Sequence, residues 1–189
     1  MRKGVVDVVV RLLADRDMSV RWVAVPVAVA LLAVTALRIQ PPLLPACLYF
    51  VVIAVVLAVI DMESRRLPNV IVLPSYVVLA VLLTAASLWR HDFWPLARAG
   101  IGGGLLFVFF LVLAAAQPAA MGFGDVKLAG LIGLVLGYLS WPALLIGAFA
   151  GFLLGGIAGV VLLARGHGRD TTIPYGPFLI AGALLAILL

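Results

Sequence analysis

Residues 42–61 read PLLPACLYFVVIAVVLAVID, an uncharged and mostly aliphatic run that ends in Asp61. A helix that crosses a bilayer needs about 20 predominantly apolar residues. An ionisable group at the end of such a run is costly unless it faces protein or a water-filled cavity. The stretch therefore predicts a membrane-spanning helix that brings an acid to one membrane face.

The rest of the chain repeats this pattern. Of its 189 residues, 66% are hydrophobic and 11% are charged, and the mean hydropathy is +1.28. Soluble domains are nearer half apolar and a quarter charged, so lipid must cover much of this surface. We expect an all-α, polytopic membrane protein with about seven spanning helices. The runs are roughly 22–38, 42–60, 69–89, 98–117, 125–140, 142–164 and 172–189, and the fifth is short for a span.

The distribution of lysine and arginine predicts the orientation, because cytoplasmic loops carry an excess of these residues. We place the N-terminus and a tail over 1–21 in the cytoplasm. Only Arg38, Arg90 and Arg98 then face the outside. The other basic residues face the cytoplasm: Arg2, Lys3, Arg11, Arg16, Arg21, Arg65, Arg66, Lys127, Arg165 and Arg169.

Charge and composition exclude several function classes. The net charge of +5 is spread over short loops without a basic face, which argues against a nucleic-acid partner. The single cysteine, Cys47, lies in an apolar run and has no internal disulfide partner. His91 and His167 are far apart and form no metal-ligand pair. We therefore expect no metal and no other cofactor.

Only some of the eight acids are placed for chemistry. Asp61, Glu63 and Asp125 lie at the ends of apolar runs, and Asp125 directly follows Gly122-Phe123-Gly124. These glycines allow backbone turns closed to other residues and the close approach of a substrate backbone. The remaining acids lie in polar segments and are expected to be solvated: Asp7, Asp15, Asp17, Asp92 and Asp170.

Each of the two aspartates also has a structural interpretation. Asp125 opens a helix, where an acid is electrostatically favoured as an N-cap. Asp61 ends a helix and could pair with Arg65 or Arg66.

Topology favours chemistry for this pair. The two spans between Asp61 and Asp125 return the chain to its starting side, so both acids reach the cytoplasmic face. Two neighbouring carboxyls titrate as a coupled pair, with one protonated and the other ionised. The ionised member takes a proton from water that attacks an amide carbonyl, and the protonated member hydrogen-bonds the carbonyl oxygen. Alternatives are a transporter that uses the acids as proton relays, or a structural subunit of a secretion system.

Three stretches resemble the prepilin peptidases, or type IV leader peptidases, a family of membrane aspartic proteases. The first is 61–69, in which Asp61 precedes a polar stretch and Leu67-Pro68. The second is 121–127, which contains the family's Gly-x-Gly-Asp-x-Lys pattern. The third is 166–178, similar to a segment typical of bacterial members. The likeness covers a core over 42–189, preceded by an extra span over 22–41, and both belong to one membrane peptidase domain over 22–189.

The resemblance implies a mechanism and a substrate. Asp61 and Asp125 would be the catalytic pair of an aspartic endopeptidase. It would cleave the short basic leader of prepilins or pilin-like precursors after a glycine, at the cytoplasmic face of the bacterial inner membrane. Lys127 would lower the pKa of Asp125, bind substrate carbonyls or act only as an interfacial cation, and Glu63 would attract the leader or pair with Arg66.

Two further features bear on the resemblance. The segment 173–178 would shape the cleft rather than act chemically. Many members carry paired CxxC motifs in a segment linked to N-methylation, but Cys47 is the only cysteine here, which puts methyltransferase activity in doubt.

Overall fold

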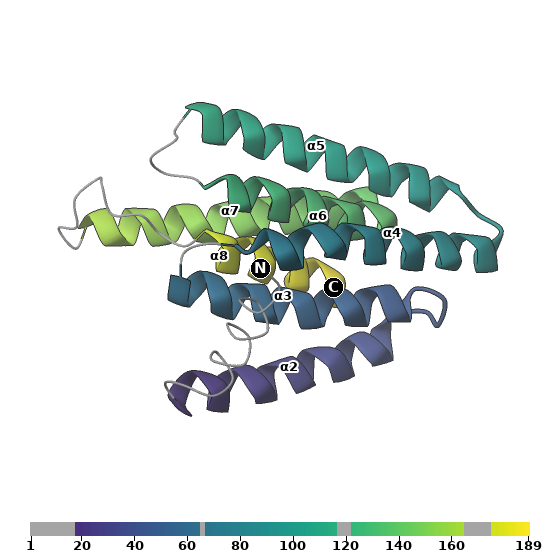
Figure 1. Cartoon of the computed structure of the whole chain (residues 1–189), viewed down its shortest axis with the longest axis horizontal. Helices are drawn as coiled ribbons and strands as arrows, with labels where there is room; N and C mark the ends of the chain where they lie inside the picture. Colours follow the sequence, from purple (N-terminus) through teal and green to yellow (C-terminus); the bar gives the residue numbers. More distant parts are fainter. Residues whose placement is uncertain (1–17, 65–66, 117–121, 165–174) are drawn as a thin grey trace.

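Helices form where the sequence supplies long apolar runs, because a backbone in lipid must satisfy its own hydrogen bonds. The structure, a computed structural model, describes residues 18–64, 67–116, 122–164 and 175–189. These ranges contain helices and no strand, and Figure 1 shows the helices gathered in one bundle. The helices are α2 (Met18–Arg38), α3 (Leu44–Ser64), α4 (Asn69–Arg90), α5 (Trp94–Ala116), α6 (Phe123–Leu139), α7 (Trp141–Ala164) and α8 (Gly176–Leu188).

The expected all-α, multi-pass membrane fold is confirmed. Each apolar run contains a helix. Helices α3, α4 and α5, together with residues 141–161 of α7, are long and apolar enough to cross a membrane. Helices α6 and α8 are shorter, with 17 and 13 residues.

Helix α6 lies at the centre of the bundle, which explains its short length. It packs against α3, α4, α5, α7 and α8, and most of its residues are buried. Because protein rather than lipid covers this helix, its length need not match the hydrocarbon thickness.

Glycines set the close approach of two helix pairs. A Cβ on Gly102 of α5 would lie 2.8 Å from the carbonyl oxygen of Gly133 on α6, closer than real Cβ atoms come. A Cβ on Gly151 of α7 would lie 2.9 Å from the Cα of Leu179 on α8. Small residues let backbones pack closely in membranes. These contacts therefore determine how closely α6 packs against α5 and α8 against α7.

Two helix boundaries matter for the site. Helix α3 continues beyond the expected end at 60, through Asp61 to Ser64, whose hydroxyl donates to the carbonyl oxygen of Ile60 at 2.8 Å. Asp61 therefore belongs to the last turn of a helix rather than to a loop. Helix α8 begins at Gly176, with a proline in its first turn, where a missing N–H is tolerated. Nearly all of the tail at 1–21 and most of 166–178 lie outside the described residues.

Candidate active site

The two aspartates meet at one end of the bundle. Asp61 lies in the last turn of α3 and Asp125 in the first turn of α6, and Figure 1 shows these two helix ends on the same side. Only 4% of Asp61 and 9% of Asp125 is exposed. Helices α3 and α6 contact each other, so the two buried carboxyls belong to neighbouring helices. Which membrane face this end occupies stays a prediction.

Asp61 is held by the N-terminus of α8. The backbone N–H of Gly176 donates to Asp61 Oδ2 at 3.1 Å. A Cβ on Gly176 would lie 2.7 Å from the same oxygen, so only glycine allows this approach. The unpaired N–H groups and the dipole of a helix N-terminus stabilise a negative charge there. This N–H therefore stabilises the ionised form of the Asp61 carboxyl.

Asp125 is not the N-cap of α6, in contrast to the structural interpretation that its position suggested. The N-cap is Gly122, which has an extended backbone and no side-chain cap. Asp125 is the third helical residue, and its carboxyl has the backbone of Gly122 as a hydrogen-bond partner. An acid at this position commonly reaches back to the N-cap amide. This contact fixes the carboxyl beside the start of the helix.

Gly124 closes the gap between α6 and the segment after α3. A Cβ on Gly124 would lie 3.0 Å from the Cβ of Leu67, tighter than nearly all real Cβ contacts. The Gly-Phe-Gly sequence thus lets the start of α6 pack against the residues that follow Asp61. In this way the two motifs become neighbours in space.

Lys127 contacts Asn69, a residue that its position beside Asp125 did not suggest. Its ammonium donates to Asn69 Oδ1 at 2.8 Å and lies 4.9 Å from the centroid of the Phe123 ring. No ion pair between Lys127 and Asp125 occurs among the described residues. In this structure Lys127 joins the starts of α4 and α6.

Glu63 is exposed two residues after Asp61. A pairing with Arg66 falls outside the described residues, since 65–66 are not among them. Glu63 therefore lies near the site but outside the buried pair.

Tyr175 and Gly176 belong to the segment that we expected to shape the cleft. In the structure Gly176 contacts Asp61 directly. Burial raises the pKa of Tyr175 to about 12, so its hydroxyl keeps its proton. This hydroxyl donates to the carbonyl oxygen of Phe152 at 3.3 Å. In the sequence, only the Pro-Tyr-Gly-Pro pattern at a helix start indicated that this segment contributes to the site.

Fold and site together define a multi-pass helical membrane protein with a buried aspartate pair. The model of the Type IV leader peptidase family matches residues 48–160, over half of the chain and including both aspartates. The chain belongs to this family, which confirms the resemblance drawn from its motifs.

Individual relatives support the same assignment. The chain is similar to the prepilin leader peptidase/N-methyltransferase of Bacillus subtilis, 30% identical over 165 residues, or 86% of this chain and 63% of the relative. The proteins of the same name from Aeromonas salmonicida (32% over 180 residues, 90% and 58%) and Pseudomonas putida (31% over 138 residues, 70% and 45%) also match. The chain thus spans about half to somewhat under two thirds of these relatives' lengths. No solved structure matches it.

Proposed function

We propose that this chain is an aspartic endopeptidase that removes the leader from type IV prepilins or pilin-like precursors, with Asp61 and Asp125 as its catalytic pair. One observation carries the proposal. Two acids on different helices that contact each other are both buried, Asp61 in the last turn of α3 and Asp125 in the first turn of α6. Membership of a leader peptidase family supports the choice of peptide bonds as substrate.

The surroundings of the two carboxyls suggest different roles. Asp61, at the N-terminus of α8, is the ionised member and takes a proton from water, whose hydroxyl adds to the scissile carbonyl carbon. Asp125 is the protonated member and gives its proton to the carbonyl oxygen. As the C–N bond breaks, the leaving amine takes the proton from Asp61. Asp125 recovers a proton from the diol, and both carboxyls return to their starting states.

The position of the pair suits a membrane-bound precursor. A prepilin carries a basic leader next to an apolar helix, which can lie in lipid beside the enzyme while the leader stays in the cytoplasm. The distribution of basic residues supports a cytoplasmic site in the inner membrane of a bacterium. Glu63, exposed near Asp61, is suited to attract the basic leader.

The test is co-expression with candidate prepilins, followed by the size shift that accompanies leader removal. The wild type should cut, and Asp61→Asn and Asp125→Asn should each lower cleavage by at least about 1000-fold, since each removes a proton-transfer group. Asp92→Asn is the matched control. Asp92 lies at the other end of the bundle, where its Oδ1 accepts from the N–H of Trp94 at 3.0 Å, a bond that Asn retains.

All variants must be shown to reach the membrane at similar levels. Full cleavage by either active-site variant would contradict the pairing and make Glu63 the next candidate. A wild type that cuts none of several prepilins would favour a transporter or a structural subunit.

A further inference from the structure

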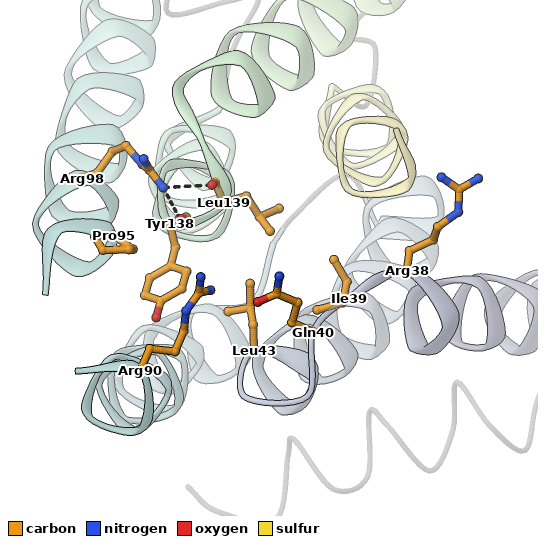
Figure 2. Close-up of a pocket in the computed structure, with 9 residues that line it drawn as sticks. All are labelled: Arg38, Ile39, Gln40, Leu43, Arg90, Pro95, Arg98, Tyr138 and Leu139. Atoms are coloured by element: carbon orange, nitrogen blue, oxygen red, sulfur yellow. Dashed lines mark hydrogen bonds between the residues drawn. The ribbon is translucent and has the colours of Figure 1, made fainter. Parts of the chain in front are cut away.

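A polar recess lies at the end of the bundle opposite the two aspartates. It has a volume of about 270 Å³ and is formed where α4 and α6 end, α5 begins and the chain passes from α2 to α3. Figure 2 shows its lining: Arg38, Ile39, Gln40, Leu43, Arg90, Pro95, Arg98, Tyr138 and Leu139. No acidic residue is among these, so the charged side chains that line the recess are all arginines.

The arginines of the recess have different roles. Arg98 closes the C-terminal end of α6: its Nε donates to Gly137 O at 2.6 Å, and its Nη2 donates to Tyr138 O at 2.6 Å and Leu139 O at 2.9 Å. Arg90 has no hydrogen bond or ion pair within the described residues, and Figure 2 shows its side chain extending beside Tyr138 and towards Leu43 and Gln40. The guanidinium of Arg38 extends away from the other two. Arg90 is thus the cation available to a ligand.

The recess lies at the level where a bilayer has its head groups. Trp89 and Trp94, next to Arg90 and Pro95, are largely exposed, and Trp141 is partly exposed two residues after Leu139. Exposed tryptophans gather at membrane–water interfaces, where one side of the ring is apolar and the other is wet. These side chains mark the depth of the recess independently of its charge.

We propose that this recess binds the phosphate group of a glycerophospholipid. A guanidinium fork matches a phosphate with two parallel N–H donors. Arg90 binds the phosphate, and the amide of Gln40 is available to the adjoining glycerol or head-group oxygens. The exposed Trp89 and Trp94, sequence neighbours of Arg90 and Pro95, contact the upper parts of the acyl chains in this proposal.

A lipid explains more of the site than a free phosphate does. A soluble anion would use Arg90 alone and leave the flanking apolar surface unused, with Trp89 80% and Leu88 56% exposed. A phospholipid uses both the charge and this surface. Bound there, it would connect α4 with the passage from α2 to α3.

The experiment measures thermal unfolding of the purified protein in an uncharged detergent. Phosphatidylglycerol, added to the micelles, should raise the Tm of the wild type by about 3–5 °C, since a ligand of the folded state stabilises it. Arg90→Gln should reduce this shift to less than about 1 °C. Arg38→Gln is the comparison variant: Arg38 also lines the recess, but its guanidinium is directed away from Arg90, so the variant removes the same charge without removing the proposed phosphate ligand. It should keep most of the shift.

Two further additions separate the sources of the effect. Inorganic phosphate or diacylglycerol, at the same concentration as the lipid, should each give little shift. An equal shift with inorganic phosphate would overturn the lipid assignment in favour of a soluble anion, and an equal shift with diacylglycerol would show that the phosphate is not recognised. Equal losses in Arg90→Gln and Arg38→Gln would reduce the effect to general surface charge and overturn the site. Arg90→Lys, which keeps the charge without the fork, should retain only part of the shift.

Discussion

At the scale of single residues, Gly176 determines how closely the start of α8 can approach the Asp61 carboxyl. Its N–H donates to the carboxylate at 3.1 Å, and a Cβ would lie 2.7 Å from the same oxygen. In Gly176→Ala the Asp61 carboxyl must move, although the helix itself gains from alanine. We expect cleavage to fall by at least about 10-fold, because a small misplacement of the proposed catalytic group is costly, with little change in the amount of protein in the membrane.

The matched control for this prediction is Gly104→Ala, at a helical glycine whose added Cβ would meet nothing within 4 Å. Cleavage should stay near that of the wild type there. If Gly176→Ala cleaves as fast as Gly104→Ala, the contact between α8 and Asp61 does not position the catalytic group.

Some features of single residues could be predicted from the sequence and others could not. Counting spans was enough to expect Asp61 and Asp125 on one side, and the structure brings them together at one end of the bundle. The contact of Gly176 with Asp61 and that of Asn69 with Lys127 could not be expected from the sequence. They join segments far apart in the chain and depend on how the helices pack. The direction of Lys127 was open for the same reason.

At the scale of elements, the starts of α4 and α6 are joined by the Lys127–Asn69 hydrogen bond and by Tyr76, whose hydroxyl donates to Lys127 O at 2.6 Å. If Lys127 only joins the helices, Lys127→Met and Asn69→Ala should each lower the free energy of unfolding by about 0.5–1.5 kcal/mol. The double variant should be little worse than either single one, since both remove the same bond. Thermal unfolding and cleavage rates of all three variants measure this.

A different result would assign Lys127 to the chemistry. If Lys127→Met loses cleavage while Asn69→Ala keeps it, the ammonium acts on the aspartates or the substrate rather than on α4.

Element boundaries also show where apolar patterns stop being informative. The apolar run ends at Ile60, but α3 continues for another turn because Ser64 and its neighbours remain hydrogen-bonded within the helix. A charged residue ends a hydropathy window without ending a helix. The buried Asp61 therefore lies in the last turn of the same helix that forms the apolar span.

At the scale of the whole molecule, the orientation of the bundle decides which compartment the aspartates face. The basic residues predict a cytoplasmic site, with His91 on the outside. Cysteine labelling in a Cys47→Ala background tests this with a membrane-impermeant thiol reagent. His91→Cys, in an exposed turn, should react in intact cells. Met62→Cys, 61% exposed beside Asp61, should react only after the membrane is opened.

The reverse labelling pattern would place the aspartates outside and exclude cleavage of leaders in the cytoplasm. The fold itself would be unaffected, because the helix order and the packing of the bundle do not depend on which face is which.

The central position of α6 has a consequence for biogenesis. This helix has only 17 residues and is enclosed by its neighbours. Contact with lipid therefore stabilises it less than it stabilises the longer helices. Its glycines fit those of α5, the helix made just before it. During synthesis, α5 and α6 are thus suited to leave the translocon as a paired hairpin, with α6 shielded on one side from the outset. Asp125 would then enter the membrane already attached to a partner, and the active site would be assembled last, when α8 closes over Asp61.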